Sequence, residues 1–118
     1  MPEETEVIRG RCHCGAVQFE VEGDLRPFVR CNCSICIRKG AVMGYVPEDR
    51  FKLLGGEDHL TVYQFNTRTA IHYFCNQCGI YPFHRPRRRP GQYGINMGCL
   101  DGVNPLRLEV VLVDGNAE

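Results

Sequence analysis

The sequence predicts a small, mainly β domain with short helical turns. Three observations support this: short runs of alternating apolar and polar residues, turn residues such as Gly55-Gly56 between the runs, and no sustained apolar period of 3.6 residues. The chain has 118 residues, the usual length of one domain, so we expect a single zinc-binding domain over 1–118. We expect this domain to bind zinc because the sequence contains eight cysteines in closely spaced groups.

The first two expected strands form a hairpin around a close pair of cysteines. One strand starts at Val7, and the other covers 17–21, where apolar and polar residues alternate. The tip of this hairpin then carries Cys12 and Cys14.

A loop and a short helical turn are expected next. Pro27 indicates a loop over 24–30, because proline cannot donate a hydrogen bond to a sheet. Ser34 is a typical N-cap residue, so we expect a helical turn over 35–39, ended by Gly40.

The remaining expected elements are strands, because the segments are rich in β-branched and aromatic residues. They cover 41–46, 51–54, 60–65, 70–74, 80–83, 93–97 and 106–113. A second close pair of cysteines lies between two of these strands, so it too is expected to cap a hairpin.

Composition and charge exclude several classes of protein. Fourteen Lys and Arg residues balance 14 Asp and Glu residues, so no net charge attracts nucleic acid or an anionic membrane. No apolar run has the length of a membrane span, and the acidic start of the sequence lacks the apolar stretch of a signal peptide. We therefore expect a cytoplasmic protein with no membrane or nucleic-acid partner.

Cysteine is unusually frequent. Eight cysteines in 118 residues, without an export signal, favour metal binding over a disulfide framework. They form the patterns C-x-C, C-x-C-x-x-C and C-x-x-C plus a single residue, at Cys12, Cys14, Cys31, Cys33, Cys36, Cys75, Cys78 and Cys99. Close pairs suit a tetrahedral metal, because two thiolates from one turn fill two corners and a distant pair fills the others.

The two outer pairs predict a structural zinc site. A glycine follows each pair and can adopt the positive φ of a tight turn around a metal. We expect Cys12, Cys14, Cys75 and Cys78 to hold one zinc with four thiolates, which leaves no coordination position for a substrate. Such a metal would join distant segments and stabilise a fold of this size. The alternative is four unrelated core thiols.

The middle group predicts a different zinc site. Cys31, Cys33 and Cys36 supply three thiolates, and three protein ligands with one open position are typical of catalytic zinc. Three thiolates favour presentation of a nucleophilic sulfur over activation of water, so we expect thiol chemistry. Two alternatives stay open: a structural site completed by Cys99 or a histidine, and a redox C-x-x-C at Cys33 and Cys36.

Three further features have candidate roles. The basic run over 85–89 is either a solvated loop, a clamp for substrate carboxylates, or a contact for nucleic-acid phosphates. Cys99 stands alone and is expected to be a packed or cavity-lining thiol, not a metal ligand. His72 and His84 flank the second cysteine pair, so they are the histidines best placed to support metal ligands there.

Together, these motifs resemble those of the glutathione-dependent formaldehyde-activating enzyme family, which includes the centromere protein V domain. The resemblance covers roughly 6–113. Its motifs are C-x-C-G at 12–15, C-x-C-x-x-C at 31–36, C-x-x-C-G at 75–79, Gly55-Gly56 with Leu60 and Tyr63, and the segment 96–101.

The resemblance implies an Mss4-like fold with two zinc ions per chain. One would be structural, on Cys12, Cys14, Cys75 and Cys78, and one catalytic, on Cys31, Cys33 and Cys36. It also implies carbon–sulfur lyase chemistry with a small thiol as partner: glutathione adds to formaldehyde to give S-hydroxymethylglutathione. Two other functions remain as alternatives, a zinc-stabilised protein-binding module without catalysis and a nucleic-acid-binding zinc protein.

Overall fold

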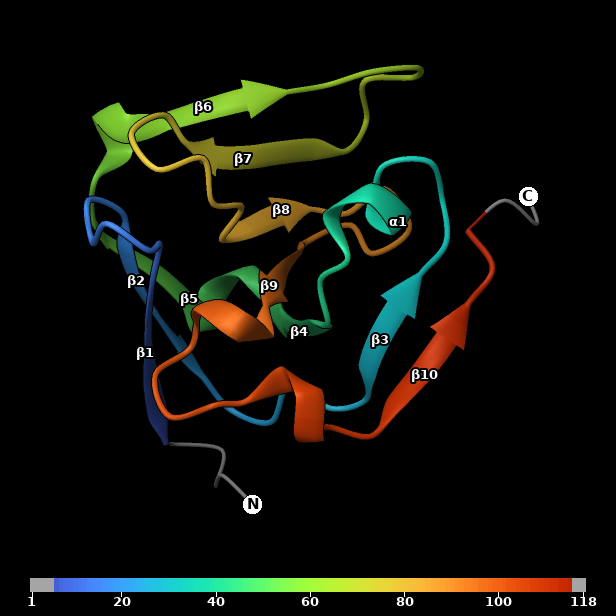
Figure 1. Ribbon diagram of the computed structural model, residues 1–118, viewed down its shortest axis with the longest axis horizontal. Helices are drawn as coiled ribbons and strands as arrows, with labels where there is room; N and C mark the ends of the chain where they lie inside the picture. Colours follow the sequence, from blue (N-terminus) through green and yellow to red (C-terminus); the bar gives the residue numbers. More distant parts are fainter. Residues whose placement is uncertain (1–5, 116–118) are drawn as a thin grey trace.

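Two β-sheets form the framework of the fold (Figure 1). The structure, a computed structural model, describes residues 6–115. Its strands are β1 (Val7–Arg11), β2 (Gln18–Glu22), β3 (Phe28–Cys31), β4 (Met43–Pro47), β5 (Phe51–Gly55), β6 (Leu60–Tyr63), β7 (Ile71–Cys75), β8 (Phe83–Arg85), β9 (Gln92–Asn96) and β10 (Val110–Val113). The order is β1-β2-β5 in the smaller sheet and β10-β3-β4-β9-β8-β7-β6 in the larger one. This confirms the predicted mainly β fold.

Short helical segments connect some of these strands. They are α1 (Cys36–Lys39) and four 3₁₀ turns at Glu48–Arg50, Glu57–His59, Met97–Cys99 and Pro105–Arg107. Within 6–115, no helix is long and apolar enough to cross a membrane.

The start of α1 differs from the prediction. Its N-cap is Ile35 and not Ser34, and no side chain caps it. The reason is the preceding turn, in which the Ile37 N–H donates to the Cys33 carbonyl at 2.9 Å and draws 34–35 into the bend between cysteines. The predicted end is confirmed: Gly40 is the C-cap, with a φ of 65°.

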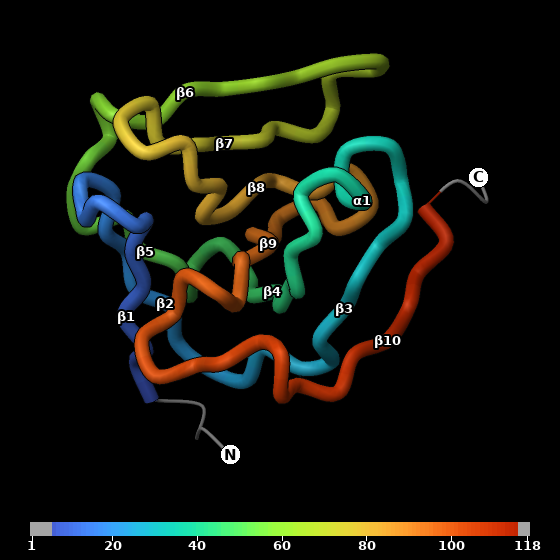
Figure 2. The backbone as a smooth tube through the Cα atoms, in the orientation of Figure 1, coloured from blue at the N-terminus to red at the C-terminus, as the bar shows by residue number. Residues whose placement is uncertain are grey.

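The expected loop over 24–30 is wrong at its C-terminal end. Residues 28–30 belong to β3, which pairs in parallel with β10 and antiparallel with β4. Pro27 directly precedes this strand and so removes no hydrogen bond from it. The tube in Figure 2 shows β3 and β10 side by side, although 78 residues separate their ends at 31 and 110.

Four strands differ from the prediction by more than one residue at an end: the strand expected over 41–46 starts at Met43, and the one expected over 60–65 ends at Tyr63. The other two begin later than predicted. Residues 80–82 lie outside β8 because the Ile80 carbonyl turns back to accept a hydrogen bond from the Cys75 N–H at 2.9 Å. At the C-terminal end, Pro105 starts a 3₁₀ turn, so the expected strand over 106–113 begins only at Val110.

An aromatic cluster joins the two sheets. Phe19 of β2 lies 5.4 Å from Phe83 of β8, between ring centroids. Phe51 of β5 lies 4.7 Å from Phe83 and 4.0 Å from Tyr93 of β9. Phe19 is fully buried, and burial of such a side chain contributes about 1.5–3 kcal/mol. The cluster holds the small sheet, which carries the first cysteine pair, against the large sheet.

Candidate functional site

The first candidate metal site joins the tip of the β1–β2 hairpin to the turn after β7. The Sγ atoms of four cysteines lie within 4.8 Å of one another: Cys12, Cys14, Cys75 and Cys78. Sγ of Cys14 is 3.6 Å from Sγ of Cys12 and 3.7 Å from Sγ of Cys75. A tetrahedral zinc with Zn–S bonds of about 2.3 Å separates its sulfurs by about 3.8 Å. These four thiols therefore fit one zinc ion.

Backbone N–H groups point at the sulfurs of this site. The Val17 N–H donates to Cys12 Sγ at 3.3 Å, and the Gln77 N–H donates to Cys75 Sγ at 3.4 Å. Backbone N–H groups also lower the pKa of Cys78 to about 6. Such donors stabilise a thiolate, which is the form that binds a metal.

The second candidate metal site forms where β3 leads into α1. The Sγ atoms of Cys31, Cys33 and Cys36 lie within 4.8 Å of one another, and no further Cys, His, Asp or Glu of 6–115 joins them. The Cys33 N–H donates to Cys31 Sγ at 3.4 Å. Burial raises the pKa of Cys33, but hydrogen bonds from Cys36 and Cys31 outweigh it and lower that pKa. Three converging sulfurs fit a zinc ion with one open position.

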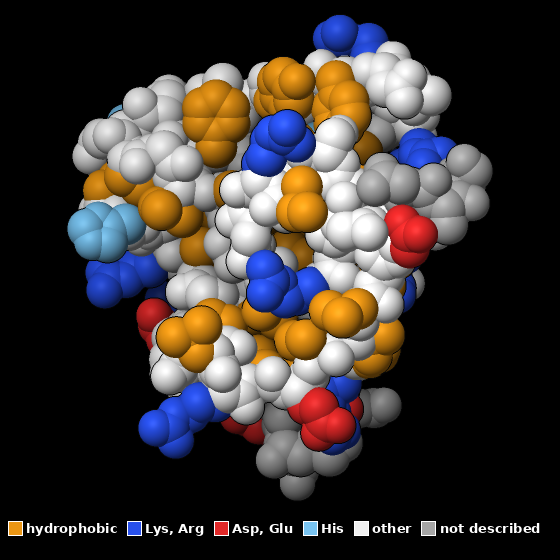
Figure 3. Space-filling model, turned by 45° about the vertical axis from the view of Figure 1, so that its right-hand side comes forward, with side chains coloured by type: hydrophobic (Ala, Val, Ile, Leu, Met, Phe, Trp, Pro, Cys, Tyr) orange, Lys and Arg blue, Asp and Glu red, His pale blue; other side chains and the backbone are white. Residues whose placement is uncertain are grey.

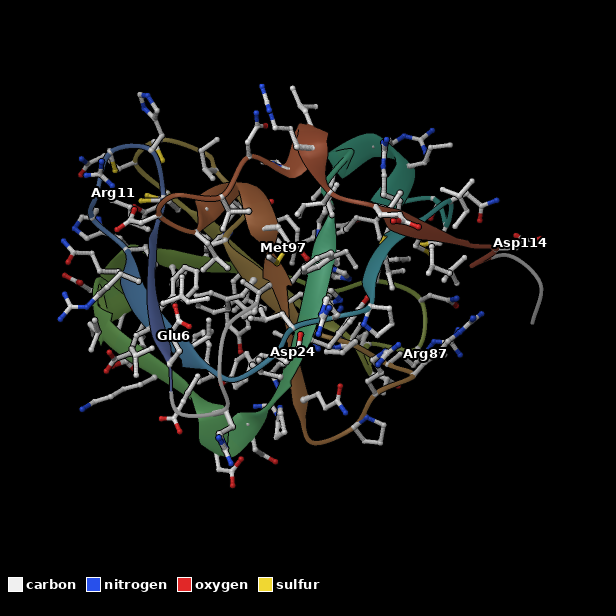
Figure 4. All side chains as sticks on the ribbon, turned by 90° about the horizontal axis from the view of Figure 1, so that it is seen from below. Glu6, Arg11, Asp24, Arg87, Met97 and Asp114 are labelled. Carbon is white, nitrogen blue, oxygen red and sulfur yellow. The ribbon has the colours of Figure 1, made fainter. Side chains whose placement is uncertain are left out.

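The two groups lie at opposite ends of the molecule. Figure 4 shows Arg11, next to the first cysteine pair, at one end. Arg87 and Asp114 lie at the other end in the same view. Arg87 lines a cavity together with all three cysteines of the second group, and Asp114 lines a neighbouring cavity together with Cys31. The two sites are therefore separate.

The three-cysteine cluster lines a cavity of about 650 Å³. Its wall combines sulfur, aromatic, imidazole and guanidinium groups, and besides the three cysteines it includes Tyr45, Phe65, His72, His84, Arg87, Arg88 and Arg89. A cavity of this size and mixed polarity suits a small organic molecule. The cavity brings together the predicted three-cysteine cluster and most of the predicted basic run.

The segment after β10 closes one side of this cavity. The Gly115 N–H donates to Oδ1 of Asn32 at 2.8 Å, and Arg88 donates to the Gly115 carbonyl at 3.3 Å. A Cβ atom at 115 would lie 2.4 Å from Cys31 Sγ. Only glycine lets the backbone approach the cluster so closely.

Arg85, the first residue of the basic run, lies apart from the cavity wall. Its guanidinium group donates to Glu48 at 3.3 Å and stacks 4.3 Å from the Tyr93 ring centroid. Arg89 instead stacks 4.1 Å from the Tyr45 ring centroid, at the cavity. The candidate carboxylate clamp is thus reduced to 87–89.

A polar group lies beside the cavity. Lys39 Nζ is 2.6 Å from Nδ1 of His72 and 3.4 Å from the ring centroid of Tyr81. His72 stacks on His84, with ring centroids 5.2 Å apart, and Nδ1 of His84 is hydrogen-bonded to the Tyr81 hydroxyl. Both histidines are buried.

Burial dominates the titration of this group. It lowers the pKa of Lys39 to about 8. Burial, and then the charge of Lys39, lower the pKa of His72 to about 4, and the same causes hold the pKa of His84 well below its ordinary value. At neutral pH, Lys39 is protonated and both imidazoles are neutral.

His72 and His84 lie with the three-cysteine cluster and not with the second cysteine pair. His72 and His84 pair across β7 and β8, which run away from the second cysteine pair, so they line the cavity of the three-cysteine cluster instead. Cys99 is buried, belongs to neither cysteine group, and its Sγ lies 3.8 Å from the Tyr81 carbonyl. Sequence reasoning missed Lys39, although its position one helical turn after Cys36 places both on one side of α1.

Comparison with known proteins gives consistent results. Residues 7–111 match the family described as glutathione-dependent formaldehyde-activating enzyme. A Halomonas elongata protein whose name places it provisionally in that family is 33% identical over 81 residues. This match covers 61% of the chain and 52% of the relative, so the chain spans about half the length of that protein.

A solved structure is also similar. The crystal structure of a Rhodobacter sphaeroides protein has a TM-score of 0.85 and 45% sequence identity, over 89% of this chain and 99% of that one. With the two cysteine clusters, the mainly β architecture is the Mss4-like fold that the sequence motifs implied.

Proposed function

This chain belongs to the glutathione-dependent formaldehyde-activating enzyme family, and on that premise we propose that it is a zinc-dependent carbon–sulfur lyase. Its substrates are a small thiol, such as glutathione, and an aldehyde, such as formaldehyde. The thiol sulfur bonds to the carbonyl carbon, and the carbonyl oxygen becomes a hydroxyl. The observation that carries the proposal is the three-cysteine cluster, which has no fourth ligand within 6–115 and lines a cavity of about 650 Å³.

The proposal assigns different roles to two zinc ions per chain. The four-cysteine site is structural, because four thiolates complete a tetrahedral shell. The site of Cys31, Cys33 and Cys36 is catalytic, because one position stays open. A zinc ion held by these three cysteines would supply Lewis acidity, toward either a thiol sulfur or an aldehyde oxygen.

Side chains of the cavity bind and orient the substrate. Phe65 and Tyr45 give it aromatic walls, against which the apolar part of a substrate can pack. Arg87, Arg88 and Arg89 supply guanidinium groups, which pair with carboxylates in a bidentate manner. A thiol that carries carboxylates, as glutathione does, therefore suits this cavity.

Neutralisation of the basic run tests this binding role. We expect the double variant Arg87→Gln, Arg89→Gln to raise KM for glutathione about tenfold and to leave kcat within about twofold. The reason is that these arginines would bind the bound substrate and the transition state equally strongly. Arg107→Gln is the control, since Arg107 lies in a 3₁₀ turn and does not line the cavity. Equal KM for a thiol without carboxylates in wild type and variant would support the carboxylate contact, and an unchanged KM for glutathione would contradict it.

Hemithioacetal formation from glutathione and formaldehyde tests the reaction. We expect zinc-loaded protein to accelerate it above the rapid uncatalysed background. Cys33→Ala should abolish the acceleration, whereas Cys99→Ala, which removes a thiol outside both clusters, should retain it. No acceleration with glutathione or any other small thiol would reject the enzyme.

One observation favours the alternative, a zinc-stabilised protein-binding module. Val111 and Leu112 of the edge strand β10 are exposed, with Leu112 79% accessible, and Leu106 is exposed in the 3₁₀ turn that precedes this strand. Figure 3 shows hydrophobic side chains on the side of the molecule where this strand lies. A fully zinc-loaded protein without thiol chemistry, in which Leu112→Glu abolishes binding to a protein partner, would establish this function instead.

A further inference from the structure

We infer that His72 donates a hydrogen bond to the substrate oxygen during thiol addition, and that Lys39 positions its imidazole for this task. The inference rests on the proposed function and deepens it. It assigns a role to a polar group that contains no metal ligand.

The His72 ring is held in one plane. It is 5% exposed and lies in the cavity wall that also contains the three-cysteine cluster. His84 stacks on it with an interplanar angle of 11°, and Phe65 stacks on it with a centroid distance of 5.9 Å and an angle of 26°. Since rings on two neighbouring segments restrict its rotation, its two nitrogens keep fixed directions.

One of these nitrogens is occupied by Lys39. The distance from Lys39 Nζ to His72 Nδ1 is 2.6 Å. An ammonium group has only donors, so the Nδ1 atom that faces it must accept and cannot carry a proton. A neutral imidazole then carries its proton on Nε2.

Lys39 is itself held in place. Its ammonium group lies 3.4 Å from the centroid of the Tyr81 ring, a cation–π contact. It remains mostly protonated at pH 7, because burial lowers its pKa only to about 8. His72 remains neutral at the same pH, with a pKa of about 4. The hydrogen bond between the two side chains requires a protonated Lys39 as donor and a neutral His72 as acceptor, and these are the forms present at pH 7.

The other nitrogen is available to a ligand. Within 6–115, His72 Nε2 has no hydrogen-bond partner, and no polar side-chain atom that is fully shielded from solvent lacks one. Nε2 is therefore accessible, and the residue lines the cavity. An N–H group in this position can donate to an oxygen of a bound aldehyde.

His84 supports this arrangement from behind. Its Nδ1 is hydrogen-bonded to the Tyr81 hydroxyl, and a Cβ atom at Gly94 would lie 2.5 Å from its Cε1. The ring therefore fills the space that glycine leaves and presents a flat, neutral face to His72. Without a second positive charge there, His72 keeps its neutral form next to Lys39.

The hydrogen bond strengthens as the reaction proceeds. When the sulfur bonds to carbon, the π electrons of the carbonyl move onto oxygen, which becomes negative. The thiol proton passes to water, and the oxygen takes a proton from water to become a hydroxyl. A preorganised donor at the oxygen stabilises the charge at the transition state, and its removal in other enzymes costs about 10²–10³ in kcat.

The tautomer of His72 is a direct test that needs no activity. In zinc-loaded wild type at pH 7, ¹⁵N NMR of the histidine rings should show His72 protonated on Nε2 only. Lys39→Met should move part of the population to the Nδ1 tautomer. Lys52→Met, a change of the only other lysine, should have no effect. An Nδ1 tautomer or an imidazolium ion at His72 in wild type would overturn the assignment.

Kinetics test the role of the donor. His72→Phe keeps a flat ring in the stack but has no N–H, so kcat should fall about 100-fold with KM within about threefold. His72→Gln carries an amide N–H near the place of Nε2 and should recover at least tenfold of this loss. A His72→Phe variant with full zinc content and kcat within twofold of wild type would refute the donor role.

These outcomes separate the inference from the proposed function. If wild type does not accelerate thiol addition, the proposed function fails, whereas the tautomer measurement still decides how Lys39 acts on His72. If His72→Phe does not fold, His72→Leu takes its place as the variant without an N–H donor. A kcat for His72→Gln at least tenfold above that of His72→Leu supports the donor role, and equal kcat values for these two variants contradict it.

Discussion

A single missing methyl group sets the distance between the backbone and the three-cysteine cluster. Gly115 follows β10, and a Cβ atom there would lie 2.4 Å from Cys31 Sγ, closer than any unstrained contact. The Asn32 side chain fixes this approach through its 2.8 Å hydrogen bond to the Gly115 N–H. The residue is thus part of the site's shape although it has no functional group.

Gly115→Ala should weaken zinc binding at the three-cysteine cluster about tenfold, as loss of a supporting contact around a metal does. It should lower activity while the thermal unfolding midpoint stays within a few degrees. Competition with a chelator measures the affinity. Gly55→Ala is a matched control, because a Cβ atom at 55 meets nothing within 4 Å. Equal zinc affinity in both variants would contradict the role of Gly115.

His72 should make stability depend on pH. Its pKa of about 4 in the fold lies below the ordinary 6.5, so between these values the unfolded chain binds more protons than the folded one. Its contribution is therefore complete above pH 6.5 and is lost as pH falls toward 4, by at most about 1.4 kcal/mol per pH unit. Burial of the imidazole is the main cause of the lowered pKa and the nearby Lys39 charge the second, and His84, whose pKa is lowered for the same reasons, adds to the effect.

Chemical denaturation between pH 7 and 5.5, with zinc content checked at each pH, measures this effect. His72→Phe should show a shallower decrease in the free energy of unfolding than wild type. Equal slopes would mean that His72 is not held neutral by the fold.

At the level of elements, the two cysteine groups differ in what they connect. The four-cysteine site links the β1–β2 hairpin to the end of β7, and Cys14 and Cys75 are 61 positions apart in the sequence. The three-cysteine cluster gathers residues of one turn between β3 and α1. Loss of a ligand should therefore have different consequences at the two sites.

Cys75→Ser should unfold the domain or destabilise it severely. Structural zinc contributes on the order of 10 kcal/mol, and a domain has only about 5–15 kcal/mol of net stability. Cys33→Ala should cost much less stability and still abolish thiol addition. Thermal unfolding of both variants, with zinc content, checks this contrast. A Cys75→Ser variant that unfolds cooperatively at the wild-type temperature would show that the role is not structural.

Local patterns predicted most strands well because neighbouring strands form hairpins. The alternation over 17–21 and the preceding apolar residues give β1 and β2 in antiparallel register, from Val7 opposite Glu22 to Arg11 opposite Gln18. The parallel pair of β3 and β10 has no such local signal, because its partners are far apart in sequence. The strand after Pro27 was therefore missed.

The residues that line the cavity could be predicted from the sequence only in part. The spacing of Cys31, Cys33 and Cys36 predicts three converging sulfurs, because one turn brings them together. His72 and Phe65 reach the same cavity from the β6–β7 region, and Arg87 reaches it from the segment after β8. No sequence spacing encodes that convergence, because tertiary packing of the large sheet produces it.

For the molecule as a whole, we expect close to two zinc ions per chain, held with unequal strength. Four thiolates surround one ion completely, whereas three leave the other exposed to a competing ligand at the cavity. Mild chelation should remove the second ion first and leave the fold intact. Quantitative metal analysis with circular dichroism checks this, and a single tightly bound zinc, or none, would contradict the two-site assignment.

The spacing of the two cysteine groups also sets an order of events during synthesis. The three-cysteine cluster is complete once Cys36 has left the ribosome, whereas Cys14 must wait for Cys75, 61 residues later. At about 5–20 residues per second, that interval lasts roughly 3–12 s. A metal ion that meets the nascent chain therefore finds the weaker site ready first. The hairpin that carries Cys12 and Cys14 spends those seconds as an open dithiol, exposed to oxidants until its distant partners emerge.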